Sequence, residues 1–200
     1  MPRYPADRKA ETRERILDAS DRLLKGRGAE RASLAEVMQA AGLTVGAFYA
    51  HFASKQALEE ATILHGIGAS MDRLLAPLEA IADDRRWRRA LIRAFLAQLD
   101  DSDLGNANPL TLVLPDVARS TAALRSAYSE RTGALLDRVA PRFPAVAGLS
   151  SREVAIAVFA TLVGAVGLAR TIPAAQARER VRRATEIFLM AAFILDDASA

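Results

Sequence analysis

The chain has 200 residues, 51% of them apolar, and a formal net charge of +3. This composition excludes a disordered chain, and the lack of cysteine excludes a disulfide framework, a thiolate zinc site and a cysteine nucleophile. The length allows one sizeable core or a small module fused to a larger one. Alanine and leucine make up a third of the chain and favour helix, and apolar residues recur at helical spacing nearly throughout, so we expect an all-α protein.

The sequence contains no pattern that favours export or membrane insertion. The charged and proline-broken start of the chain has no apolar segment of the kind that a signal peptide needs. The longest uncharged run, residues 154–169, is shorter than the ~20 residues that span a bilayer. We therefore expect a cytoplasmic protein without a membrane partner, in which this run forms a buried or interface helix.

The first two predicted elements are helices of different length. Apolar spacing predicts a helix over residues 8–25, which Gly26 and Gly28 are expected to end. A short helix over residues 34–41 follows. Ser33 is its expected N-cap, because a serine oxygen accepts a hydrogen bond from a free backbone N–H of the first turn.

A tight turn and two further helices are predicted next. Gly42 stands where the chain needs a left-handed residue after a helix. Thr44 is the expected N-cap of a second short helix over residues 45–51, and Ser54 of a long helix. Pro77 must kink or end that long helix, because proline lacks a backbone N–H.

The rest of the chain also shows helical patterns. A helix is predicted over residues 84–99, and Ser120 is the expected N-cap of another that reaches about residue 140. Ser150 and Glu153 have capping-box spacing and open a helix to residue 170. Pro173 starts the last helix, which is expected to end near residue 195.

The two short helices and the glycine turn between them have the geometry of a helix-turn-helix, in which the second helix enters the major groove of DNA. Apolar residues at Val37, Ala41, Leu43 and Phe48 are placed to pack the two helices together. Ordinary helical hairpins share this pattern, so the turn alone leaves a purely structural role open.

Three segments carry a stronger signal: TRERILDA at residues 12–19, SLAEV at 33–37, and AGLTVGAFYAHFASK at 41–55. Over residues 8–62 the chain resembles the TetR/AcrR family of bacterial transcription regulators. The resemblance implies a three-helix DNA-binding domain, here residues 1–53, and a helical ligand-binding and dimerisation domain, here residues 54–200. It also implies a homodimer that binds a palindromic operator, by family habit as a repressor, and is released by a small-molecule effector.

Departures from the family pattern affect the expected base contacts. Ala32 stands where threonine is frequent, Met38 where alanine is common, and Val45 where many members carry a polar or basic residue. With Val45 and Ala47 apolar, base reading would rest on methyl contacts to thymine, with possible help from Arg31. We expect fewer directional base contacts than a lysine- or arginine-bearing helix makes.

The expected DNA-binding residues combine small side chains with hydrogen-bond donors. Gly46 and Ala47 let the backbone approach DNA, and Thr44, Tyr49 and Lys55 offer donors for phosphate oxygens. Tyr49 could instead be a core aromatic with its hydroxyl at the surface, and the imidazole of His51 could simply lie near a helix C-terminus. The complete set is Arg31, Ser33, Thr44, Val45, Gly46, Ala47, Tyr49, His51 and Lys55.

The balanced charge of the chain means that any positive face must come from folding. It would gather Arg3, Arg8, Lys9, Arg27, Arg31 and Lys55, and a dimer would double it. The N-terminal Arg3, Arg8 and Lys9 could be a mobile arm on the DNA backbone or a solvated tail. The arginines around Trp87 are better explained as the wet faces of an amphipathic helix.

The last two helices carry apolar residues around much of their circumference, so a two-fold four-helix interface is the expected dimer contact. Few charges interrupt the candidate pocket positions, which favours an apolar or aromatic effector, although each position could be plain core. The candidates are Met71, Leu75, Trp87, Phe95, Leu112, Tyr128, Phe159 and Leu162.

Enzyme activity is not expected, and neither is a cofactor or a metal. The chain has no cysteine and no phosphate-binding glycine loop, and its two histidines lie in or near the helix-turn-helix region. His65 is expected to be a polar core or interface residue. A ligand-binding or scaffold protein with a vestigial helix-turn-helix remains the alternative class.

Overall fold

The structure, a computed structural model, describes residues 5–27, 32–99, 111, 113–146 and 148–194. Every regular element in these ranges is a helix, apart from one isolated bridge between Val146 and Leu149. The predicted all-α class is therefore confirmed. The helices after the turn regions are α4 (Lys55–Leu75), α5 (Asp84–Leu96), α7 (Leu114–Ala118), α8 (Ala122–Val139), α9 (Ser151–Arg170) and α10 (Ala175–Ile194).

The N-terminal helix is longer than the sequence pattern predicts. Helix α1 spans Pro5–Arg27, because proline is tolerated in the first turn, where its missing N–H would have no partner. Gly26 lies inside the helix and does not end it, and Gly28 is outside the described residues. The short helices α2 (Leu34–Ala40) and α3 (Val45–Phe48) follow.

Three of the predicted helix starts are confirmed by their side-chain caps. The hydroxyl of Ser33 accepts from Glu36 N, that of Ser54 from Ala57 N, and Ser150 forms the expected capping box with Glu153. The prediction for Ser120 is wrong, because Thr121 is the N-cap of α8. The hydroxyl of Ser120 instead donates to the carbonyl oxygen of Val117, at the end of α7.

Two further predicted ends are adjusted by short 3-10 turns. Pro77 ends the long helix as expected, since α4 stops at Leu75 and the turn Ala76–Leu78 follows. The helix predicted over residues 84–99 is α5 plus the turn Ala97–Leu99.

The apolar side chains form two separate cores. The small core joins α1, α2, α3 and the first turns of α4 around Ile16, Met38 and Phe48. The large core joins α4, α5, α8, α9 and α10 around Leu91, Phe95 and Leu162. The expected stripe on the arginine-rich helix is confirmed, because Trp87 and Phe95 are buried in this large core.

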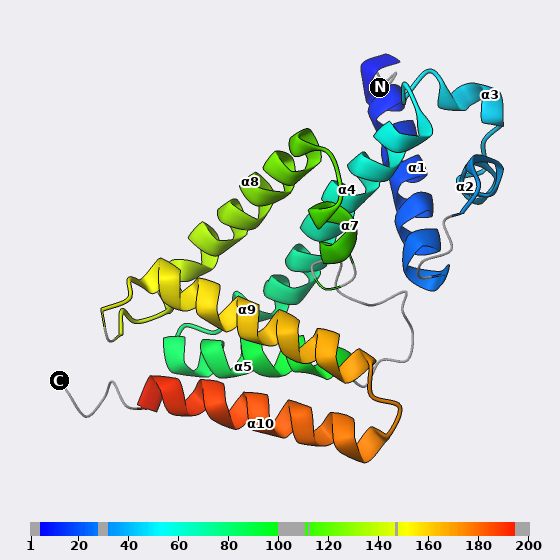
Figure 1. The fold of residues 1–200 in the computed structure, drawn as a ribbon. Coiled ribbons are helices and arrows are strands. Elements are labelled where there is room, and N and C mark those ends of the chain that lie inside the picture. The colour runs from blue at the N-terminus through cyan, green and yellow to red at the C-terminus, as the bar shows by residue number, and fades with distance from the viewer. Residues whose placement is uncertain (1–4, 28–31, 100–110, 112, 147, 195–200) are drawn as a thin grey trace.

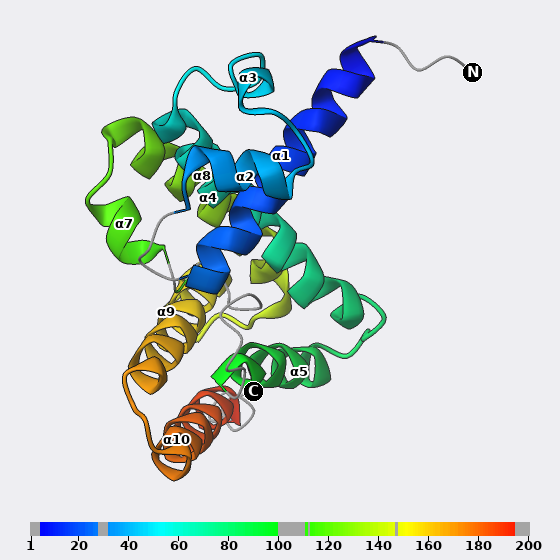
Figure 2. The same cartoon turned by 90° about the vertical axis from the view of Figure 1, so that its right-hand side faces the viewer.

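Helix α4 contributes to both cores and runs from the small core to the large one (Figure 1). Helices α5, α9 and α10 pack side by side at the end opposite α2 and α3, and the quarter-turn view shows the same separation (Figure 2). Helix α3 and the α9–α10 pair therefore lie at opposite ends of the molecule.

Helix α9 is long and apolar enough to cross a membrane by length and composition alone. Its Val158, Phe159 and Leu162 are buried against α5, α8 and α10, as in the core helix of a folded domain. The structure agrees with the expectation that residues 154–169 form a buried or interface helix.

Candidate nucleic-acid interface

The turn between α2 and α3 is held in one conformation by backbone and side-chain bonds. Gly42 has a φ of +69°, the left-handed conformation that glycine adopts at little cost. Its N–H donates to Gln39 O, and the N–H of Leu43 donates to Met38 O, which is the Schellman arrangement at a helix end. Arg15 of α1 donates to Ala41 O at 2.7 Å and anchors the turn to the first helix.

One face of α3 is buried and the other is exposed to solvent. The ring of Phe48 is buried and stacks on the ring of Phe52 with centroids 5.7 Å apart. Val45 and Tyr49 lie on the other side, with 43% and 70% of their surface exposed. The ring of Tyr49 meets the edge of Phe48, so its place at the surface is fixed by the core beneath it.

The small residues at the start of α3 differ in exposure. Thr44 and Gly46 are exposed, whereas Ala47 is half-buried against the small core. Thr44 is the N-cap of α3 by position, but its side chain makes no capping hydrogen bond. The hydroxyl of Ser33, by contrast, is engaged with Glu36 in the capping box of α2.

A cluster of cationic groups beside α3 was only partly foreseen from the sequence. Partial burial lowers the pKa of His51 from its ordinary value, and the charges of Lys9 and Arg13 lower this pKa further. The guanidinium of Arg13 lies 5.0 Å from the centre of the Phe52 ring. Lys9 and Arg13 stand one turn apart on α1, so Lys9 belongs to a helix and not to a mobile arm.

Arg13 is the residue that sequence reasoning missed. Its four-residue spacing from Lys9 was visible, but the face of α1 that meets α3 depends on how the helices pack. Arg3 and Arg31 lie outside the described residues, as does the side chain of Arg27.

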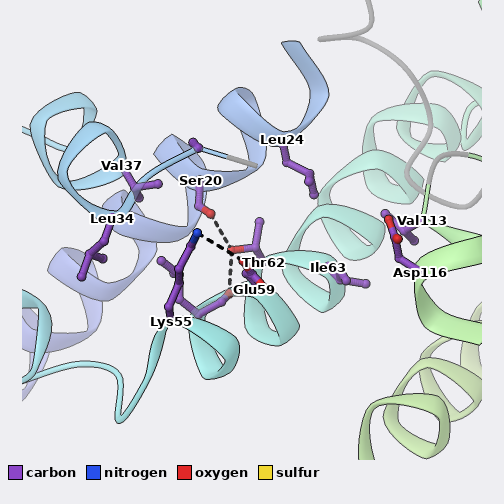
Figure 3. Close-up of a pocket in the computed structure, with 12 residues that line it drawn as sticks. Ser20, Leu24, Leu34, Val37, Lys55, Glu59, Thr62, Ile63, Val113 and Asp116 are labelled. Carbon is purple, nitrogen blue, oxygen red and sulfur yellow. Dashed lines mark hydrogen bonds and ion pairs between the residues drawn. The ribbon is translucent and has the colours of Figure 1, made fainter. Parts of the chain in front are cut away.

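Lys55 is placed differently from the other predicted contacts. Its ammonium lies 3.7 Å from a carboxylate oxygen of Glu59, and its side chain is about half exposed. It lines a pocket between α1, α2, α4 and α7 (Figure 3). A phosphate contact by Lys55 therefore competes with this ion pair.

The other histidine also joins two helices. His65 Nε2 of α4 lies 2.7 Å from Asp18 Oδ1 of α1. This pair is polar and partly exposed, in agreement with an interface position between the two helices.

A second feature of the structure is a pocket in the large domain, about 210 Å³ in volume, between α7, α8 and α9. Of the predicted pocket residues, Tyr128 and Phe159 line it. Among the described residues that line it, only Tyr128 and Thr132 have polar side chains, and burial raises the pKa of the Tyr128 phenol.

Most of the other predicted pocket residues are placed elsewhere. Their apolar side chains are buried in the large core and do not line this pocket, because the amphipathic stripes of α4, α5 and α9 meet there. They are Met71, Leu75, Trp87, Phe95 and Leu162. Leu112 lies outside the described residues.

Helices α9 and α10 also expose apolar side chains. Leu168 on α9 and Phe188 on α10 are 57% and 64% exposed, and Ile156 and Ile187 are exposed as well. On α9, a Cβ added to Gly164 would meet no atom within 4 Å. Val158 of α9 and Leu189 of α10, by contrast, are buried within the subunit.

Comparison with known proteins matches the helix-turn-helix region. Residues 16–62 match the family model described as bacterial regulatory proteins, tetR family. The chain is 35% identical over 80 residues to the transcriptional regulator TtgR of Pseudomonas putida, which is 40% of this chain and 38% of that relative. The matched part thus spans well under half of the relative's length.

Solved structures extend the likeness in fold to nearly the whole chain. A TetR-family regulator from Cytophaga hutchinsonii superposes with a TM-score of 0.70 at 19% identity, covering 93% of this chain and 96% of that one. The reduced form of NemR from E. coli gives 0.68 at 20% identity, covering 88% and 95%. The family match covers residues 16–62, and the likeness to these solved structures, at 19% and 20% identity, is a likeness in fold.

Proposed function

We propose that the protein is a transcription regulator that binds a palindromic operator as a homodimer and is released by a small apolar or aromatic effector. The supporting observation is the exposed face of α3, with Val45 and Tyr49 held outward over a buried aromatic pair and beside Lys9, Arg13 and His51. A solvent-facing helix with cationic neighbours is what a major groove and its phosphates require.

The DNA-binding unit corresponds to residues 1–53 and the ligand and dimer unit to residues 54–200. The small core includes Leu58, so the first turns of α4 serve both units. Exposed Val45 would meet base edges and Gly46 would let the backbone approach DNA, while Thr44 and Tyr49 would bind phosphates. This assignment makes the protein a cytoplasmic DNA-binding protein of the repressor type.

The dimer would form through α9 and α10. Ile156 and Leu168 of α9 and Ile187 and Phe188 of α10 expose apolar side chains that a partner subunit would cover, and Gly164 would allow a partner helix to approach closely. Two-fold symmetry would place two α3 helices about 34 Å apart, or a multiple of it, on a palindromic site.

The effector would bind the pocket between α8 and α9. Apolar walls favour an uncharged, apolar or aromatic molecule, and the hydroxyls of Tyr128 and Thr132 can hydrogen-bond one polar group on it. Release follows if the effector binds better to a form in which the two reading helices are wrongly spaced for DNA. Ile156 and the pocket-lining Val163 lie on α9, which links the pocket to the dimer face.

A gel-shift experiment with the DNA upstream of its own gene tests this function. We expect a specific complex whose affinity falls steeply with salt, because phosphate contacts release counterions. Failure to shift this DNA or a library-selected site would contradict the proposed function, and a flat salt dependence would contradict the phosphate assignment. A panel of apolar and aromatic compounds, followed by thermal shift and by DNA release, tests the effector class.

A further inference from the structure

The structure also holds a pocket at the junction of the two cores, which shares no lining residue with the one between α7, α8 and α9. Its inner part, about 60 Å³, is lined by apolar side chains of both units, among them Leu24 of α1, Val37 of α2, Leu58 of α4 and Val113 just before α7 (Figure 3). The polar pair beneath it is already satisfied, since the hydroxyls of Ser20 and Thr62 lie 2.9 Å apart. The apolar side chains that surround this pair favour an apolar group in the inner part.

The outer part of this junction pocket is acidic. It continues into a wider hollow of about 390 Å³ that shares Glu59, Ile63 and Asp116 with the inner part. Among the described residues that line this hollow, Glu60 is the third carboxylate and Arg119 the one cation. Lys55 pairs with Glu59 at 3.7 Å and Arg119 with Asp116 at 3.3 Å. The five charged side chains that the structure describes along both parts therefore sum to one negative charge.

We propose that this junction pocket is a second ligand site, which takes a small amphipathic cation. The apolar end enters between Leu24, Val37 and Leu58, and the cationic end lies against Glu59, Glu60 and Asp116. Charge complementarity excludes an anion of the same shape and makes a neutral molecule a weaker ligand.

The junction pocket lies where a bound ligand would affect the position of the DNA-binding unit. Its walls belong to α1 and α2 on one side and to α7 on the other, and α7 packs mainly on α8 of the large domain. A ligand that touches both walls binds best to one relative position of the two units and shifts the population toward it. This coupling rests on the proposed DNA-binding function, whereas binding itself does not.

The test compares three probes of equal length on the DNA-free full chain: hexylamine, hexan-1-ol and hexanoate, by calorimetric titration. We expect hexylamine to bind most tightly, hexan-1-ol less tightly and hexanoate least. Asp116→Asn should weaken hexylamine binding about two- to fivefold, the range of an exposed charge pair. Asp137→Asn is the matched control, because Asp137 also pairs with an arginine but lies outside the pocket.

Two variants, each with a larger side chain in one of the two pockets, show which pocket binds hexylamine. Leu24→Trp should abolish hexylamine binding, while Thr132→Phe, which fills the pocket between α8 and α9, should leave it unchanged. The reverse pattern, or equal affinity for amine and alcohol in the wild type, would overturn the proposal. If Leu24→Trp does not fold by circular dichroism, the Asp116→Asn and Asp137→Asn pair decides the matter.

Operator affinity with and without saturating hexylamine then tests the coupling. We expect at least a twofold change in the wild type and none in Leu24→Trp. An unchanged affinity in the wild type would overturn the coupling. Absence of any operator complex would instead contradict the DNA-binding function, which the titrations without DNA do not use.

Discussion

Single side chains around α3 determine how the protein would meet DNA. Tyr49 is exposed because the ring of Phe48 beneath it fills the small core, and its hydroxyl is free to reach a phosphate oxygen. Arg13 and Lys9 approach the same surface from α1. Phosphate contacts position a protein without reading sequence, so substitutions here should act on all DNA sites alike.

Tyr49→Phe should weaken binding to specific and unrelated DNA by a similar factor. Loss of one hydrogen bond to a charged oxygen costs about 1.5–3 kcal/mol at most in a well-formed contact, and less at an exposed one. The ring and its edge contact with Phe48 remain, so the free energy of unfolding should not change. Fluorescence anisotropy on two DNA sequences checks this, and a loss confined to one base pair would contradict the phosphate assignment.

Lys55→Ala should also weaken binding to all sequences and reduce the salt slope by about one unit. The ion pair with Glu59 competes for this ammonium, so Glu59→Gln should strengthen DNA binding slightly. Affinity measured across a salt series tests both variants. An unchanged salt slope in Lys55→Ala would show that its ammonium stays with Glu59 in the complex.

The imidazole of His51 gives a pH dependence with a definite sign. Burial and then Lys9 and Arg13 hold its pKa below the ordinary value, so it is largely neutral in the free protein at pH 7. A nearby DNA phosphate offsets those positive charges and raises this pKa in the complex. DNA binding then takes up a proton, and affinity should rise as pH falls from about 7.5 to about 6. His51→Gln should flatten this rise, and an equal rise in both proteins would contradict it.

At the scale of elements, the turn between α2 and α3 requires glycine at one position. Gly42 combines a positive φ with a close neighbour, since an added Cβ would lie 3.3 Å from Arg15 Nη2. That same guanidinium group holds Ala41 O. The conformation of the turn and its attachment to α1 therefore depend on one glycine.

Gly42→Ala should destabilise the protein by about 1–2 kcal/mol, the cost of a left-handed non-glycine residue. Gly46→Ala is the matched control, because its φ is ordinary and its added Cβ would meet Thr44 Oγ1 only at 3.9 Å. Denaturant unfolding of the two variants measures the difference. Equal stability of Gly42→Ala and the wild type would contradict the strain at this turn.

Helix starts could be predicted from short stretches of sequence, whereas features that depend on how helices pack could not. Ser33, Ser54 and Ser150 cap helices as their positions indicate, because a cap depends on a few neighbouring residues. Ser120 and Thr121 offer two equivalent hydroxyls for the cap of α8. The hydroxyl of Ser120 donates to Val117 O at the end of α7, and Thr121 is the cap. The same limit applies to the site, where Tyr49 was identifiable from its motif but Arg13 was not.

At the scale of the whole molecule, the reading surface and the expected dimer surface lie at opposite ends of α4 (Figure 1). Helical periodicity gives the apolar faces of α9 and α10, but it does not tell which of them turn inward. The structure buries Phe159 and leaves Phe188 exposed, which indicates where a second subunit would bind. For the same reason Tyr128 lines a pocket while Phe95 is plain core.

Gly164→Leu should produce a folded monomer. Its added side chain would meet no atom of its own subunit near Cβ, but it would hold a partner helix away from α9. The matched control is Ala134→Leu, an exposed small residue on α8. Analytical ultracentrifugation at micromolar concentration measures the oligomeric state of both variants. A dimeric Gly164→Leu variant would show that the interface does not include Gly164. A monomeric wild type would contradict the dimer itself.

The most direct test of the central claim is the selection of bound DNA from a random library, followed by sequencing. A homodimer with one α3 in each half-site predicts an enriched inverted repeat, with half-site centres about one helical turn or a multiple of it apart. Enrichment of a single asymmetric half-site would contradict the two-fold model. No enrichment over the unbound library, with the protein folded, would contradict sequence-specific DNA binding.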